Sequence, residues 1–162
     1  SRVIHSSLCI WNKDSRIVRV YGVKNKPQIM VHKLTHALFP HRDKLIRNMM
    51  GIPMEKRFGN YLSFPMCGFN NDAWVLTFRD VKSYIPLTEL GPDHTKWGMR
   101  FIGGLPRIDN VYKQHISYAE AGSFGSHLIN TYGIDKIKGK TFWQSLMTLK
   151  SKALSLNLKI YI

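Results

Sequence analysis

Two short runs rich in β-branched and aromatic residues open the chain. They cover Val3 to Trp11 and Arg16 to Val23, and the polar cluster Asn12-Lys13-Asp14-Ser15 separates them. Val, Ile and aromatic residues favour strands, whereas short clusters of Asn, Asp and Ser favour turns. The pattern therefore predicts an N-terminal β-hairpin.

A mostly apolar stretch bounded by prolines follows. It runs from Gln28 to Phe39, after Pro27 and before Pro40. Proline is tolerated in the first turn of a helix and moves the residue before it away from helical geometry, so a short, largely buried helix is predicted here. A second helix is predicted from Arg42 to Met50, with Gly51 as its C-terminal stop.

Helical spacing of apolar residues returns late in the chain. It covers Tyr118 to Tyr132, which ends at Gly133, and Thr141 to Leu156. Prolines and glycines interrupt the pattern between Ile52 and Arg107, where Ala73 to Arg79 fits either a strand or a helix. Strands followed by helices favour an α+β fold, in which an N-terminal hairpin or small sheet precedes a mainly helical core.

The length and charge of the chain narrow the classes of protein. Residues 1–162 suit a single domain with one core, whether complete or part of a longer chain. The 24 Lys and Arg against 10 Asp and Glu give a formal charge of +14. This excess makes a polyanion such as nucleic acid a candidate partner. No RNP pattern, zinc-finger spacing or phosphate-cradling glycine loop accompanies the charge, so a solvated basic face explains it equally well.

The cysteines and the longest apolar runs carry weaker information. Cys9 and Cys67 are the two cysteines, too few for a disulfide framework, which fits an intracellular reducing compartment and leaves the localisation open. No apolar run approaches the roughly 20 residues that span a bilayer. A membrane span is therefore not expected.

His32 and His36 are the candidates for chemistry. Two histidines four residues apart on a helix project from one face and can close on a single zinc ion. Apolar residues flank the pair on both sides, so the imidazoles are expected to be shielded from water and to need partners. A metal ion would provide one, and protein hydrogen bonds in a satisfied core would provide the alternative.

The string from Val31 to Leu38, VHKLTHAL, resembles the zinc-binding helix of the gluzincin metallopeptidases of the thermolysin-like class, where VHELTHAL-type sequences supply two ligands. The stretch from Tyr118 to Lys136 is similar to the helix that follows the active site in small peptidase-like members. Ile85 to Leu90, IPLTEL, looks like a loop of the same group. The resemblance implies a zincin-like core with zinc bound by His32 and His36.

Two departures from that family imply a compromised site. Lys33 replaces the general-base Glu, and a protonated lysine cannot accept a proton from zinc-bound water. Cys67 stands where the family places a third ligand, a Glu on the next helix, and as a thiolate it can complete a His-His-Cys site. Asp72 and His41 are weaker alternatives, and Glu120 lies in a helix that the family uses for support.

Three functions follow from these observations. The first is a metallopeptidase-like pseudoenzyme, inactive or nearly so as a hydrolase and retained as a binding or scaffolding module for a peptide or protein. The second is a basic nucleic-acid or ribonucleoprotein component with aromatic residues available for base stacking. The third is an active zinc peptidase that carries a Glu-to-Lys substitution. The aromatic residues of the second interpretation are Trp11, Tyr21, Trp74 and Trp97.

Overall fold

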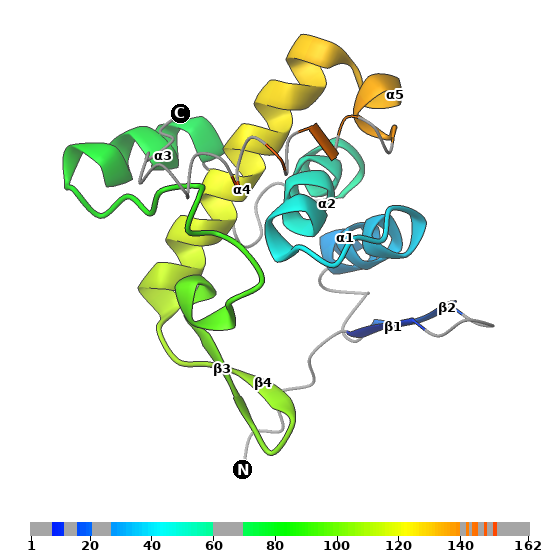
Figure 1. The fold of residues 1–162 in the computed structure, drawn as a ribbon, viewed down its shortest axis with the longest axis horizontal. Helices are drawn as coiled ribbons and strands as arrows, with labels where there is room; N and C mark the ends of the chain where they lie inside the picture. Colours follow the sequence, from blue (N-terminus) through cyan, green and yellow to red (C-terminus); the bar gives the residue numbers. More distant parts are fainter. Residues whose placement is uncertain are drawn as a thin grey trace.

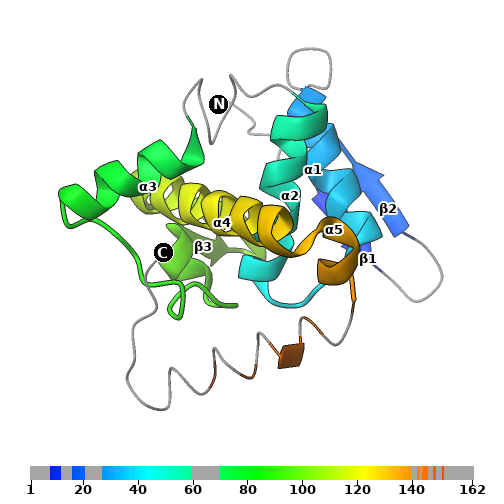
Figure 2. The ribbon, with the colours of Figure 1, turned by 90° about the horizontal axis from the view of Figure 1, so that it is seen from above.

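A long central helix organises the molecule. In the computed structural model, which describes residues 8–11, 16–20, 27–59, 70–139, 142, 144–145, 148 and 151, helix α4 spans Val111–Tyr132. Helix α2 (Lys44–Phe58) packs on one side of α4, and α3 (Asn71–Asp80) packs on another. Helix α1 (Pro27–Leu38) packs on α2, so the helices form a bundle around α4 (Figures 1 and 2).

The N-terminal hairpin is confirmed. Strands β1 (Leu8–Trp11) and β2 (Arg16–Arg19) pair antiparallel, with Leu8 opposite Arg19 and Trp11 opposite Arg16. Both strands contact α1. The molecule is mostly helical with small antiparallel sheets, which confirms the expected α+β fold.

Helix α2 is longer than its sequence pattern predicted. Asp43 caps its start by accepting from the backbone N–H groups of Leu45 (2.8 Å) and Ile46 (3.4 Å). The prediction that it ends at Gly51 is wrong, because the helix continues through Pro53 to Phe58. Gly51 is a point of close approach: a Cβ there would lie 2.8 Å from a ring carbon of His32.

The predicted bounds of helix α1 are correct to within one residue, and the predicted end of helix α4 is correct. Helix α1 matches the predicted stretch to within one residue at each end, and α4 ends at Tyr132 before Gly133 as expected. Helix α4 begins seven residues earlier than predicted, where the side chain of Asn110 caps it. Ala73 to Arg79 is helical, as part of α3.

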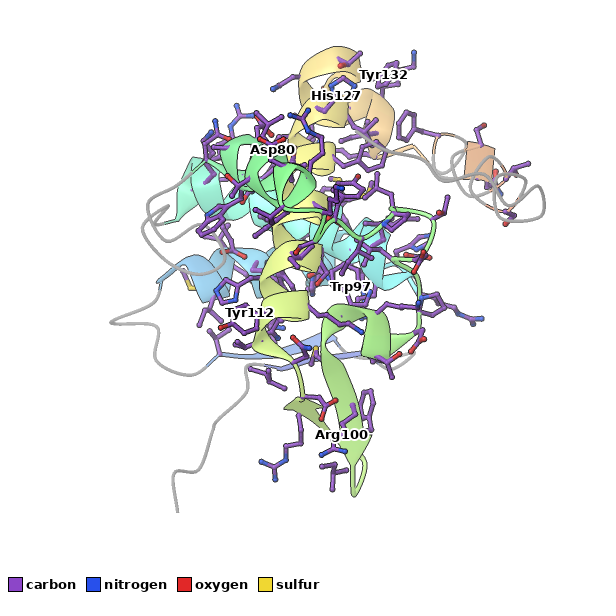
Figure 3. The ribbon with its side chains drawn as sticks, turned by 90° about the vertical axis from the view of Figure 1, so that its left-hand side faces the viewer. Asp80, Trp97, Arg100, Tyr112, His127 and Tyr132 are labelled. Atoms are coloured by element: carbon purple, nitrogen blue, oxygen red, sulfur yellow. The ribbon has the colours of Figure 1, made fainter. Side chains whose placement is uncertain are left out.

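A second hairpin was not predicted. Helix η1 (His94–Trp97) leads into β3 (Met99–Ile102), which turns at two glycines and pairs antiparallel with β4 (Leu105–Ile108). The hairpin projects from the helices, and Figure 3 shows Arg100 on it. Pro106 and the glycines hid these strands from the sequence pattern.

The core lies where α2, α4 and the segment before β3 meet. Trp97 is fully buried there and donates from its indole N–H to the carbonyl of Gly91 at 3.1 Å. The buried face of α4 also carries a polar row at three-residue spacing, which is Gln114, Ser117, Glu120 and Ser123. The apolar core consists of Leu45, Met49, Met50, Ile52, Leu87, Leu90, Trp97, Ala121, Leu128 and Ile137.

Two expectations concern the ends of the chain and the membrane. The predicted helix from Thr141 to Leu156 lies largely outside the described residues, and its described positions are helical. A short helix, α5 (Ile134–Ile137), precedes it. Among the described residues, no helix is both long and apolar enough to cross a membrane.

Candidate functional site

His32 and His36 lie side by side on the buried face of α1. Both side chains are buried, and their ring centroids are 4.3 Å apart in an edge-to-face arrangement. The spacing of four residues brings them together as the helical pattern requires. The ring of Tyr118 on α4 lies parallel to that of His32, 6.4 Å away, so the pair faces the centre of the bundle.

Both ring nitrogens of His32 are held by helix α2. Nδ1 contacts the Glu55 carboxylate oxygen Oε1, and Nε2 lies 3.1 Å from Oδ1 of Asn48. The Asn48 amide nitrogen donates to the carbonyl of Lys44 at 2.9 Å, so its oxygen must face His32. Nε2 therefore carries a hydrogen and donates it to Asn48, while Nδ1 faces the Glu55 carboxyl group.

His36 differs from His32 in having an unpaired nitrogen. Its Nε2 is buried and has no hydrogen-bond partner among the described residues. Burial lowers the pKa of His36 far below its ordinary range, and the charges of His32, Lys33 and Arg47 lower it further. A hydrogen bond to the backbone of Arg47 opposes these effects without reversing them. His36 is therefore neutral at physiological pH.

Of the candidate ligands from outside α1, the structure describes Asp72 and His41, and both make contacts elsewhere. Cys67 lies outside the described residues. Asp72 accepts a hydrogen bond from the hydroxyl of Ser123 at 2.6 Å, and Nδ1 of His41 accepts from the backbone N–H of Asp43 at 3.0 Å. Neither of these two side chains contacts the histidine pair in the described structure.

Sequence reasoning missed Glu55. This residue is the glutamate on the helix after the histidine helix, which is the element where the resemblance puts its third ligand. Asn48, Gly51 and Glu55 follow a spacing of three and four residues, which places them on one face of a continued helix. The spacing therefore indicated Glu55, but the prediction that the helix ends at Gly51 left Glu55 outside the helix.

In the described structure, the side chains at the histidine pair are not arranged to bind a zinc ion. Both nitrogens of His32 are engaged in hydrogen bonds, and the Glu55 carboxylate is the partner of one of them. In the part of the chain that the structure describes, no three His, Cys, Asp or Glu side chains are arranged to hold a metal ion. Zinc stays a prediction, and no chemical step is derived through it.

Lys33 contributes positive charge to the same neighbourhood. Its side chain is half-buried, and its charge lowers the pKa of both His36 on α1 and Lys44 on α2. A lysine at this position therefore repels a divalent cation rather than activating its water.

Glu120 connects the central helix to the IPLTEL segment. It is fully buried, its Oε1 accepts from the backbone N–H of Ile85 at 2.9 Å, and its Oε2 has no hydrogen-bond partner in the described part of the chain. Burial raises the pKa of Glu120 to about 8, so the carboxyl is largely protonated at neutral pH. The contact supports the loop and lies apart from the histidine pair's own hydrogen bonds.

The aromatic residues proposed for base stacking are not equally available. Trp97 is fully buried and cannot stack on a base. Figure 3 shows its place among the elements around α4. Trp74 on α3 is partly exposed and stacks on Phe78 with centroids 5.4 Å apart. The side chains of Trp11 and Tyr21 lie outside the described residues.

The resemblance to gluzincins thus rests on the sequence strings alone. No protein-family model, no curated protein and no solved structure matches this chain.

Proposed function

We propose that this chain is a peptidase-like helical domain without hydrolytic activity, retained as a binding or scaffolding module. The observation that carries the proposal is the engagement of both nitrogens of His32 by Glu55 and Asn48. A histidine binds a metal through the lone pair of one ring nitrogen, and here Nε2 is a donor while Nδ1 faces a carboxyl group. The arrangement supports a structural role for His32 between α1 and α2.

Lys33 supports the same proposal from the chemistry of the reaction. Peptide hydrolysis at a metal needs a base that accepts a proton from water, and an ammonium group has no lone pair for it. The neighbouring Arg47 adds a second positive charge near His36. Together these charges disfavour a bound divalent cation at the histidine pair.

A peptide-cleavage assay tests the proposal. The purified chain is incubated with a fluorogenic peptide mixture with and without a chelator, and its zinc content is measured by elemental analysis. We expect no cleavage above the blank in either condition. Chelator-sensitive cleavage by the unaltered chain would contradict the proposal and favour an active zinc peptidase. Stoichiometric zinc that both His32→Ala and His36→Ala remove would establish the predicted metal site.

The contacts of the acidic residues favour a second candidate function, which is binding to nucleic acid. Of the ten, nine are described, and each has an internal partner. Four of them form exposed or partly exposed ion pairs with basic residues. The remaining five cap helices or bond to His32, Ser123 and the backbone of Ile85.

The basic residues keep much of their charge at the surface as a result. Seven exposed ones form no ion pair within the described part of the chain, and these are Arg42, Lys56, Arg57, Lys82, Arg107, Lys113 and Lys136. Dispersed cations neutralise phosphates without reading bases, so binding should be indifferent to sequence and should weaken steeply with salt. Oligonucleotide titrations at two salt concentrations test this, and sequence-selective binding that survives high salt would contradict it.

A further inference from the structure

A buried lysine that forms no ion pair with any described residue lies at the start of helix α2. The side chain of Lys44 is 6% exposed. Its ammonium contacts the sulfur of Met99 at 3.0 Å and lies 4.7 Å from the centre of the Trp97 ring. Neither group carries a negative charge. Lys44 also occupies the first turn of α2, where the helix macrodipole is positive and disfavours a cation.

Other basic side chains lie near Lys44. Arg47 follows one turn later on α2, Lys33 comes from α1 and His94 comes from η1. Burial first, and then the charges of Arg47 and Lys33, lower the pKa of Lys44 to about 7. Burial and the charges of Lys44 and Arg47 likewise lower the pKa of His94, which the adjacent Asp93 partly offsets. Four basic side chains from three elements therefore share one region.

Unpartnered nitrogens gather in the same region. Five side-chain atoms of the described residues are buried without a hydrogen-bond partner, and three of them are nitrogens of Arg47 (Nε), His94 (Nδ1) and His36 (Nε2). A buried donor such as the Arg47 Nε–H costs about 1–3 kcal/mol when it is left unpaired. The cationic Arg47 Nε–H indicates a missing acceptor that carries negative charge, whereas the rings of His36 and His94, whose pKa values are lowered, do not fix the sign of a partner.

No described residue accepts a hydrogen bond from the Arg47 Nε–H. Asp43 accepts from two backbone N–H groups of α2, and Asp93 accepts from the backbone and hydroxyl of Thr95. Glu55 is bound to His32, and the other described carboxylates lie in the contacts given above. Lys33, Arg47 and His94 are partly exposed, so an ion can reach the cluster from their side.

We propose that Lys44, Arg47, His94 and Lys33 form a binding site for a phosphate group at the junction of α1, α2 and η1. A tetrahedral oxyanion accepts from the Arg47 Nε–H, gives Lys44 a counter-charge and reduces the repulsion among Lys33, Lys44 and Arg47. His36 is neutral and adds no charge to this site. The inference goes beyond the binding module proposed above, because it names a ligand chemistry and the residues that hold it.

Thermal unfolding of the full chain with inorganic phosphate tests the site. Sodium phosphate is compared with sodium chloride at equal ionic strength and pH, because binding to the folded state raises the melting temperature. We expect a higher melting temperature in phosphate for the wild type, and the same gain in Lys56→Met, an exposed lysine on the same helix. Lys44→Met should lose the gain.

A second variant keeps the test independent of how Lys44→Met folds. Arg47→Lys retains the positive charge and removes the Nε–H donor, so phosphate affinity measured by calorimetry should fall about tenfold, the loss of one charge-assisted hydrogen bond. Equal melting temperatures of the wild type in phosphate and chloride would overturn the proposal. So would a phosphate effect that survives in both variants.

The source of the phosphate group is distinguished by a third measurement. A single-stranded oligonucleotide is titrated against the wild type, Lys44→Met and Lys56→Met. Binding that Lys44→Met weakens more than Lys56→Met supports the site as a contact for nucleic-acid phosphates. Phosphate stabilisation without any oligonucleotide binding supports the site for a free phosphate group, while the nucleic-acid function fails. Oligonucleotide binding that both variants weaken equally, with no effect of inorganic phosphate, overturns the site.

Discussion

The imidazole of His32 on α1 lies directly against Gly51 of α2. A Cβ at Gly51 would stand 2.8 Å from the ring carbon Cε1 and 2.9 Å from Nδ1. This contact lets the two helices approach closely enough for Glu55 and Asn48 of α2 to hold the ring from both sides. The residue expected to stop the helix is therefore the one that makes the buried polar network possible.

Replacing Gly51 by alanine should destabilise the protein. The added methyl group would overlap the His32 ring, and overpacking of this kind costs about 1–3 kcal/mol, more than the gain in helix propensity. Urea unfolding of Gly51→Ala measures the loss. The control is the same substitution in a His32→Ala background, where the space is open. An equal loss in both backgrounds would show that the contact with His32 is not the cause.

Replacing Glu55 by glutamine should be more damaging than any exposed acid-to-amide change. The carboxyl is buried and bonded to His32, and breaking a buried pair by removing one partner typically costs about 3–5 kcal/mol. Asp135→Asn serves as a matched control, since Asp135 is exposed and pairs with Lys138 at the surface. Similar stabilities of the two variants in urea would contradict a structural role for the Glu55 contact.

Glu120 should make the protein less stable as the pH rises from about 5 to 8. Burial raises the pKa of Glu120 to about 8 from its ordinary 4.5, so the folded state binds more protons than the unfolded state in this window. The slope is at most about 1.4 kcal/mol per pH unit for one group. Unfolding of wild type and Glu120→Gln at pH 5 and pH 7 checks this. The variant should lack part of the decline, and parallel curves would contradict the assignment.

Lys44 should act in the opposite direction at higher pH. Burial lowers the pKa of Lys44 to about 7 from its ordinary 10.5, so the unfolded state binds more protons between these values. The cost of burying a charged Lys44 is therefore absent above about pH 10.5, grows as the pH falls from 10.5 to 7, and is complete below about 7. Unfolding in phosphate-free buffer at pH 8 and pH 10 should show a rise for the wild type that Lys44→Met lacks. A rise of the same size in Lys44→Met would exclude Lys44 as its source.

The sequence pattern predicted the elements that local patterning specifies and missed those that contacts specify. Pro27 and Pro40 bounded α1, and Gly133 ended α4, because proline and glycine act on the backbone of their own neighbourhood. Gly51 gave the same local signal, but in the structure it lies against His32, a side chain from another helix. Pro106 interrupts the strand pattern in the sequence of β4, although this strand pairs with β3 in the structure.

The candidate site was also predictable only in part. The spacing of His32 and His36 fixed their common face, whereas their partners come from α2 and could not be known without the helix packing. Glu55 became visible as a partner only when α2 extended past Gly51. The phosphate cluster joins Lys33, Lys44 and His94 from three elements, and no spacing in the sequence relates them.

The polar row on the buried face of α4 fixes where that helix can sit along its own axis. Glu120 is tied to the backbone of Ile85, and Ser123 is tied to Asp72 on α3. Moving α4 by one turn, about 5.4 Å, would break both bonds and press a carboxyl group against the apolar core. An apolar surface alone would tolerate such a slide. The bundle therefore has one permitted register, and a partner that binds at one end of α4 can tilt or release this helix but cannot push it lengthwise as a piston.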